Sequence, residues 1–182
     1  MKNLKLSLLL VLLIIFGLSG CNQVGSIHPV GSEPVSLNPE DWNGKWGLPF
    51  EKEFLRLRVL DGDNGMLRMV SYDSKGEPEK SQDVLLRRVD GWTFASVAKE
   101  GGGDGYLFAR INNSGGRTLL VWLPDYDRFR GLVEKGVLPG KTDPETVTLG
   151  LLLAVHLKLI TSGEVGTLFD WDDPVVLIRL DR

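Results

Sequence analysis

The feature that most constrains the fold is a series of short apolar segments between residues 41 and 123, each followed by turn-forming residues. Residues 54–60 alternate leucine and valine with arginine, a pattern typical of a strand with one buried face. Asp90-Gly91 separates two such segments and is typical of a type I′ hairpin, because both turn positions need a positive φ. The series predicts seven sequential antiparallel strands, over residues 41–47, 54–60, 66–72, 84–89, 92–97, 106–111 and 118–123.

A meander of this kind closes most easily as a barrel, because closure removes exposed strand edges. Residues 174–180 are strongly β-forming and predict a last strand that closes the barrel. The segment 119–123 is apolar on both faces, so the outer face must be covered. The fold class predicted is therefore mainly β, an antiparallel meander closing as a β-barrel.

Two short helices are predicted before the last strand, and they would supply that cover. The first has Asp125 as its cap, runs to Lys135 and ends at Gly136. The second runs through residues 151–160. Its beginning is ambiguous, because Val147 and the neighbouring threonines favour a strand. Its surface is so apolar that it is either deeply buried or lies on a partner.

The first twenty residues have the order of a secretory signal. Lys2 and Lys5 give a basic start, an unbroken apolar run covers residues 8–16, and small residues follow. The run is shorter than the about 20 apolar residues that span a bilayer. The small residues lead directly into Cys21, the only cysteine in the chain.

The segment Leu18-Ser19-Gly20-Cys21 resembles the lipobox of bacterial lipoproteins. The resemblance implies that residues 1–20 are a signal peptide and that Cys21 becomes a lipidated N-terminus carrying palmitate-type acyl chains. It implies a membrane partner, reached through lipid on Cys21, and location in the cell envelope. Asn22 stands where an aspartate would favour the inner membrane, which implies the outer membrane.

Residues 21–40 are interpreted as the lipidated N-terminus and a flexible tether, because residues 22–39 are rich in Gly, Ser, Pro and Asn without a period. His28 lies inside this tether. Residues 41–182 are predicted to be the barrel domain. Without the first twenty residues the net charge falls from -3 to about -5. The chain therefore has no basic excess for nucleic-acid binding.

Gly44-Lys45-Trp46 at the start of the meander resembles the Gly-x-Trp motif of lipocalins. The resemblance implies a lipocalin-like barrel in which Trp46 plugs one end and a late arginine, Arg179, packs across the indole. The chain is also similar to uncharacterised bacterial lipoproteins with lipocalin-like domains, over about residues 41–182. That family brings no known activity with it.

No arrangement in the sequence predicts catalysis, a cofactor or a metal site. His156 is alone in an apolar helix, where a catalytic base would need an orienting carboxylate and a nucleophile. Asp61, Asp63 and Asn64 lack the glutamate of a calcium loop and predict a hairpin turn. The glycines of 101–105 are not followed by the Lys and Ser/Thr of a phosphate loop. The acidic segment 170–173 predicts a solvated turn.

Two non-enzymatic functions remain. In the first, the lipid-anchored barrel binds a small apolar molecule or lipid, and an interior filled by side chains would exclude this function. In the second, the anchored domain is an interaction or scaffolding protein that docks on another envelope protein through the apolar helix at 151–160.

Overall fold

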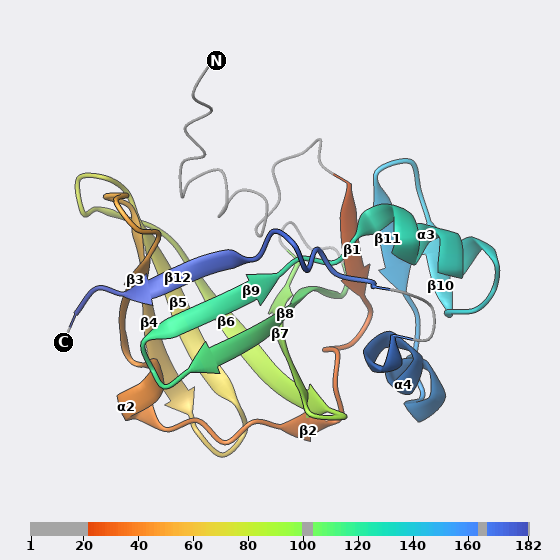
Figure 1. Ribbon diagram of the computed structural model, residues 1–182, viewed down its shortest axis with the longest axis horizontal. Helices are drawn as coiled ribbons and strands as arrows, with labels where there is room; N and C mark the ends of the chain where they lie inside the picture. Colours follow the sequence, from red (N-terminus) through yellow and green to blue (C-terminus); the bar gives the residue numbers. More distant parts are fainter. Residues whose placement is uncertain (1–21, 100–103, 164–166, 182) are drawn as a thin grey trace.

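The computed structural model describes residues 22–99, 104–163 and 167–181. Eight antiparallel strands close into a barrel (Figure 1). The barrel strands are β3 (Gly44–Gly47), β4 (Phe54–Asp61), β5 (Met66–Tyr72), β6 (Pro78–Val89), β7 (Trp92–Ala98), β8 (Tyr106–Ser114), β9 (Thr118–Trp122) and β12 (Val175–Arg179). The predicted fold class, mainly β with a closed antiparallel barrel, is confirmed.

Strand β12 closes the barrel, as the β-forming segment near the C-terminus predicted. It pairs with β3 on one side, where Arg179 lies opposite Trp46, and with β9 on the other, where Ile178 lies opposite Thr118. Strands β3 to β9 follow one another around the wall in sequence order. The turn between β6 and β7 has φ of 48° at Asp90 and 78° at Gly91, which confirms the type I′ hairpin.

The wall has an apolar core on each side. Along β9, Leu119 and Val121 belong to the inner cluster, whereas Leu120 and Trp122 pack with the outer one. Strands that are apolar on both faces need a second layer over their outer face. The prediction that the outside of the barrel must be covered is therefore confirmed.

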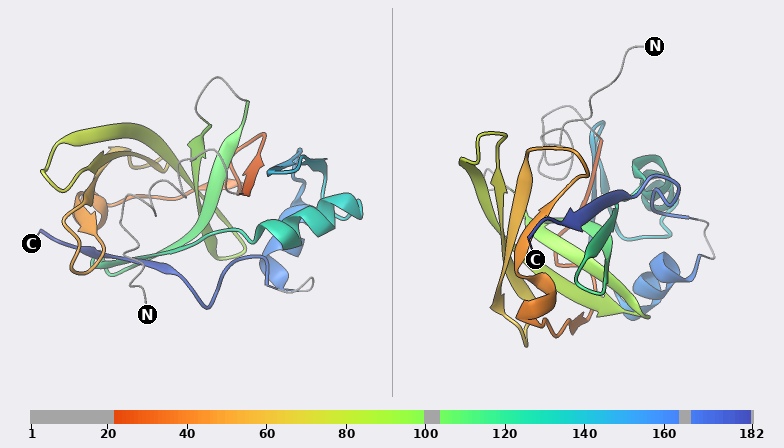
Figure 2. Two further views of the ribbon diagram at one scale, coloured as in Figure 1. Left: turned by 90° about the horizontal axis from the view of Figure 1, so that it is seen from above. Right: turned by 60° about the vertical axis from the view of Figure 1, so that its left-hand side comes forward.

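The outer layer consists of two helices and a small side sheet, which gather on one side of the barrel (Figures 1 and 2). Its elements are α3 (Tyr126–Glu134), α4 (Ala154–Ser162), β1 (Gln23–Ser26), β11 (Thr146–Leu149) and β10 (Gly140–Thr142). Strand β1 joins this sheet to the barrel, because it pairs with β8 and with β11. The outer core includes the fully buried Phe129 of α3 and Leu149 of β11.

Both predicted helices are present. The carboxylate of Asp125 caps α3 by accepting the Arg128 N–H at 3.1 Å, and Gly136 follows the helix with a φ of 68°. Helix α4 begins at Ala154, later than predicted, because Val147 and its threonine neighbours form β11. Its buried side is Leu157 and Ile160.

The prediction of a flexible tether is wrong for residues 22–40, and the folded part therefore begins before residue 41. This segment forms β1, β2 (Glu33–Pro34) and α2 (Pro39–Trp42). Its scattered aliphatic side chains are the reason, because Val24, Val30, Val35 and Leu37 are all buried. Its two glycines serve close packing rather than flexibility: a Cβ at position 25 would lie 2.7 Å from the Tyr106 carbonyl oxygen, and one at position 31 would lie 2.6 Å from the Cβ of Arg87.

Truncation tests this correction. A chain that begins at Asp41 loses β1, β2 and four buried aliphatic side chains, those of Val24, Val30, Val35 and Leu37. It also leaves the edges of β8 and β11 that paired with β1 without a partner. Each buried aliphatic side chain that is removed lowers the free energy of unfolding by about 2 kcal/mol. We expect the melting temperature to fall by at least about 10 °C relative to a chain that begins at Asn22. Equal melting temperatures would show that the N-terminal segment does not stabilise the fold.

Candidate functional site

A cavity of about 440 Å³ lies inside the barrel. Its wall is apolar, and every barrel strand except β3 contributes to it. The apolar residues that the barrel strands contribute to the wall are Leu55, Leu57, Leu67, Met69, Val84, Leu86, Ala95, Val97, Leu107, Phe108, Ala109, Ile111, Leu119, Val121 and Leu177. Ala95 and Ala109 lie opposite each other on β7 and β8, and two small side chains at one level leave space in the interior.

Trp42 lines the closed end of the cavity, and Trp46 packs next to it. The side chain of Trp46 is fully buried, and its indole N–H donates to the Trp42 carbonyl oxygen at 3.0 Å. Trp46 itself does not line the cavity. Helix α2 therefore presents one tryptophan to the cavity while the first barrel strand supplies the packing beneath it.

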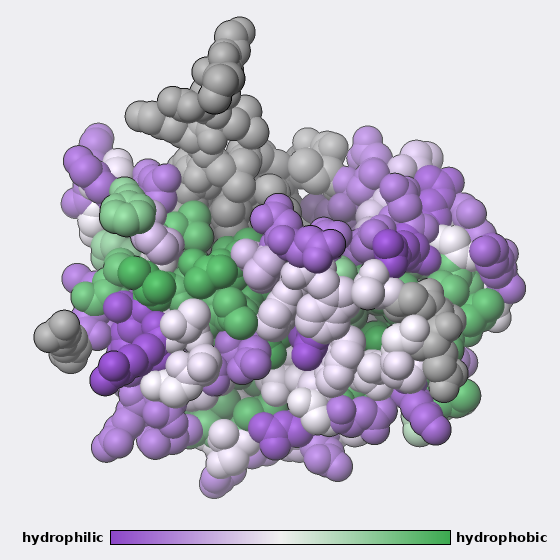
Figure 3. Space-filling model, viewed as in Figure 1, coloured by the Kyte–Doolittle hydropathy of each residue, from purple (hydrophilic) through white to green (hydrophobic). Residues whose placement is uncertain are grey.

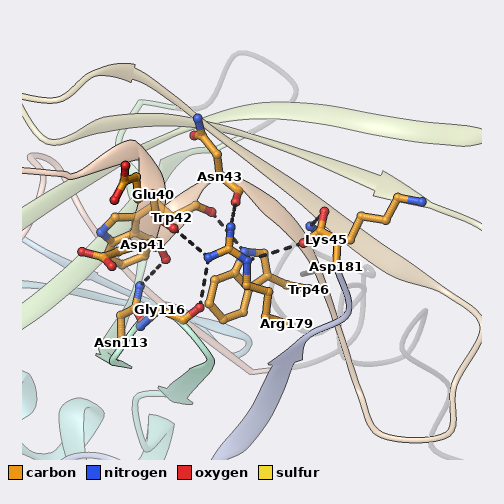
Figure 4. A network of polar contacts seen from close by, with 10 residues as sticks. All are labelled: Glu40, Asp41, Trp42, Asn43, Lys45, Trp46, Asn113, Gly116, Arg179 and Asp181. Carbon is orange, nitrogen blue, oxygen red and sulfur yellow. Dashed lines mark hydrogen bonds and ion pairs between the residues drawn. The ribbon is translucent and has the colours of Figure 1, made fainter.

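Arg179 lies across this closed end (Figure 4). One guanidinium nitrogen, Nη1, donates to the carbonyl oxygens of Glu40 at 2.7 Å and Gly116 at 3.2 Å, and Nη2 donates to that of Asn43. The guanidinium carbon lies 6.0 Å from the centroid of the Trp46 ring. The structure thus brings together the two residues that the lipocalin resemblance singled out, at the end of the barrel opposite the mouth.

The other end of the cavity carries its polar groups. Asn22 and Gln23 of the N-terminal segment line this mouth, together with Asp125, Asp127 and Asp170. Asp125 forms an ion pair with Arg128 at 3.0 Å. Burial, together with the charges of Asp125 and Asp173, raises the pKa of Asp170. The rim is therefore acidic. The sequence missed this, because it predicted only a solvated turn for residues 170–173.

Arg110 is held in an aromatic cage outside the barrel wall. Its guanidinium carbon lies 3.8 Å from the ring centroid of Trp92, 4.0 Å from that of Trp171 and 4.9 Å from that of Trp122. Burial lowers the pKa of Arg110, and its Nε and Nη1 lack a hydrogen-bond partner within the described residues. Because Trp171 directly follows Asp170, the cage fixes the segment that carries the acidic rim.

Replacing Arg110 with alanine tests this arrangement. The variant loses both the cation–π contacts and the packing of the side chain against the indole rings of Trp92 and Trp171, which contact each other edge to face. We expect a loss of about 1–3 kcal/mol in the free energy of unfolding and a clear change in tryptophan fluorescence. Arg68→Ala is the control, because Arg68 and its partner Asp83 are both about half exposed. Equal losses in the two variants would contradict a stabilising cage.

The remaining candidate residues have structural environments. The Nδ1 atom of His156 accepts the Leu153 backbone N–H at 3.1 Å, so this histidine caps α4. Asp61 accepts from Asn64 within the hairpin turn that the sequence predicted. His28 is exposed. Cys21, the predicted signal peptide and residues 101–103 of the glycine loop lie outside the described residues.

Within residues 22–99, 104–163 and 167–181, no group of three or more His, Cys, Asp or Glu side chains is placed to hold a metal ion. In the same part of the chain, no helix has the length and apolarity needed to cross a bilayer. Comparison with protein-family models, with curated proteins and with solved structures found no significant match. The resemblances to bacterial lipoproteins and to lipocalins therefore stay predictions from the residues that carry them.

Proposed function

We propose that this chain is a lipid-anchored protein of the bacterial outer membrane, whose barrel binds one small apolar molecule or single-chain lipid. The choice of the outer membrane rests on Asn22, which follows the lipidated cysteine. The observation that carries the binding function is the cavity of about 440 Å³ inside the barrel. An interior filled by side chains would have excluded this function. Eight-strand barrels have an interior wide enough either to be filled or to hold one small ligand.

The cavity volume sets the size of the ligand. Ligand pockets in proteins usually measure about 300–1,000 Å³. A dry apolar cavity of about 150 Å³ holds benzene, so about three times that volume has room for about 18 carbon atoms. One acyl chain or a compact fused-ring molecule has this size, whereas a two-chain phospholipid would have to leave one chain outside.

The distribution of polar groups sets the ligand's orientation. Away from the rim, the described residues that line the cavity offer aliphatic side chains, the sulfur of Met69 and the aromatic rings of Phe108 and Trp42. Tyr126 also borders the cavity, but its hydroxyl donates outward, to the carbonyl oxygens of Asp143 and Pro144. The apolar body of a ligand would therefore lie inside, and its polar group would lie at the rim.

The acidic rim limits which kind of polar head group the ligand can carry. Asp127 and Asp170 bring negative charge to the mouth, whereas the charge of Asp125 is paired with Arg128. A carboxylate or phosphate head group would be repelled there, because like charges at close range destabilise a complex. A neutral hydroxyl-bearing or cationic head group fits this rim best.

A fluorescence titration tests binding. The neutral apolar probe N-phenyl-1-naphthylamine brightens when it leaves water, and we expect one probe molecule to bind per chain of residues 22–182. The bound probe should be displaced by a neutral single-chain lipid such as 1-hexadecanoylglycerol. A titration without saturation would contradict the proposed binding function.

Exposed apolar side chains near the start of α4 support an alternative function, docking on another envelope protein. Leu151, Leu153 and Val155, at and just before the start of α4, are 59%, 55% and 66% exposed. Three neighbouring exposed apolar side chains fit docking on another envelope protein. Crosslinking in intact envelopes tests this, with Leu153→Asp as the variant. A crosslinked species that forms equally well with the variant would contradict docking through this patch.

A further inference from the structure

The described chain begins at the mouth of the cavity. Asn22 and Gln23 both line the cavity. Asn22 directly follows Cys21 in the sequence, and Cα atoms of consecutive residues are about 3.8 Å apart. A lipid carried by Cys21 would therefore be attached within a few ångströms of the cavity mouth.

The residues that connect this attachment point to the barrel are held in place by strand pairing and burial. The Gln23 backbone N–H donates to the Glu145 carbonyl oxygen at 2.8 Å, and Gln23 pairs with Thr146 of β11. The next residue, Val24, is buried in the outer core, and Gly25 pairs with Leu107 of β8. The N-terminal strand is thus part of the folded body from its first residue.

A second feature lies at the same end of the barrel. Strands β3 and β9 run in the same direction, because each is antiparallel to β12. Since β9 ends at the mouth, the loop that follows β3 also leaves the barrel on the mouth side. The tip of this loop is Phe50, whose side chain is 105% exposed and whose backbone has a φ of 71°.

Full exposure is costly for a phenylalanine, because burying such a side chain contributes about 1.5–3 kcal/mol. Figure 3 shows further apolar atoms on the surface over β3 and β12. An aromatic side chain at a loop tip suits the boundary between lipid head groups and acyl chains.

From these placements we propose that the lipid on Cys21 holds the mouth of the barrel against a bilayer, so that a single-chain ligand moves between bilayer and cavity without crossing water. This inference rests on the proposed function, both on the anchor and on the cavity as a binding site. The partner is a lipid surface with zwitterionic head groups, because the acidic rim would be repelled by an anionic one.

Depth-dependent fluorescence quenching tests the orientation. Once Cys21 is lipidated, the domain has no other cysteine, so a label can be attached at one introduced site. Asp127→Cys places the label at the rim, and Asp63→Cys places it in the exposed turn between β4 and β5, at the opposite end. Strands of seven or eight residues separate these ends by about 25 Å.

The full-length lipidated protein is bound to phosphatidylcholine vesicles that contain lipids spin-labelled at the head group. We expect quenching at position 127 to be at least about threefold stronger than at position 63, because the label at position 63 would lie about 25 Å farther from the bilayer surface. Equal quenching at the two positions, or stronger quenching at position 63, would overturn the proposal. Protein that does not bind the vesicles would overturn it too, because the anchor would be missing.

A linker insertion provides the matched control. Twelve Gly/Ser residues between Cys21 and Asn22 would allow a reach of about 20 Å, and quenching at position 127 should then fall towards that at position 63. The same insertion in the turn at Asp90–Gly91, at the closed end of the barrel, should leave quenching unchanged, because nothing lies within 4 Å of a Cβ at residue 91. Probe binding by residues 22–182 in solution is measured separately, so failed binding and failed orientation are distinguishable.

Discussion

Replacing Ala95 with phenylalanine is expected to weaken binding of N-phenyl-1-naphthylamine by at least about tenfold, or about 1.4 kcal/mol. The side chain of Ala95 lines the cavity from β7, opposite Ala109 on β8. A benzyl group at this position would occupy the space that the probe needs. The fold should tolerate the change, because filling a cavity commonly raises the free energy of unfolding by about 0.5–2 kcal/mol.

Ala98→Phe is the matched control for this prediction. Ala98 lies on the same strand, but its side chain is exposed on the outside of the barrel. The control should bind the probe as the wild type does, because a phenyl ring there does not enter the cavity. Undiminished binding by a folded Ala95→Phe variant would show that the probe binds elsewhere.

Among the single substitutions, replacing Trp46 with alanine is expected to have the largest effect on stability. Its side chain is fully buried at the closed end, and Arg179 packs across it. Truncation of a buried tryptophan to alanine costs about 3–5 kcal/mol. For a chain of this size we expect thermal unfolding to show a melting temperature lower by about 10 °C or more.

Phe50→Ala is the control for the Trp46 variant. It also removes an aromatic ring, but from a fully exposed position, and should change the free energy of unfolding by less than about 0.5 kcal/mol. If the two variants melt at the same temperature, Trp46 does not hold the closed end together. Probe affinity of the folded Trp46→Ala protein should stay close to that of the wild type, because Trp46 does not line the cavity.

The barrel could be predicted because its signals are local. Alternation of apolar and arginine side chains along residues 54–60 indicates a strand with one buried face. The pair Asp90-Gly91 indicates a tight hairpin. Each signal lies within a few residues of the element that it specifies. The cap at Asp125 and the glycine after α3 are local in the same way, and both were predicted correctly.

The N-terminal segment could not be predicted because its partners are distant in the sequence. Strand β1 pairs with residues 146–149, more than a hundred positions away. Composition rich in Gly, Ser and Pro suggested a linker, yet the aliphatic residues between them are buried. The glycine at position 25 allows close contact between strands, which sequence composition alone does not distinguish from flexibility.

The cavity and its acidic rim also could not be predicted from the sequence. Whether a barrel interior is filled depends on the summed volume of side chains from many strands, and here Ala95 and Ala109 fall at the same level. The cage around Arg110 combines tryptophans from three separate segments. By contrast, the meeting of Trp46 and Arg179 could be proposed, because a family resemblance supplied the long-range contact.

Native mass spectrometry tests the central claim, ligand binding inside the barrel, most directly. The chain of residues 22–182 is incubated with three amphiphiles of equal chain length, bearing a trimethylammonium, a glycerol ester or a carboxylate head group. We predict one bound molecule per chain, with the cationic or neutral amphiphile preferred over the carboxylate, and a clearly smaller bound fraction on the Ala95→Phe variant at the same amphiphile concentration. An unliganded chain with all three amphiphiles, or equal binding by the variant, would contradict the account.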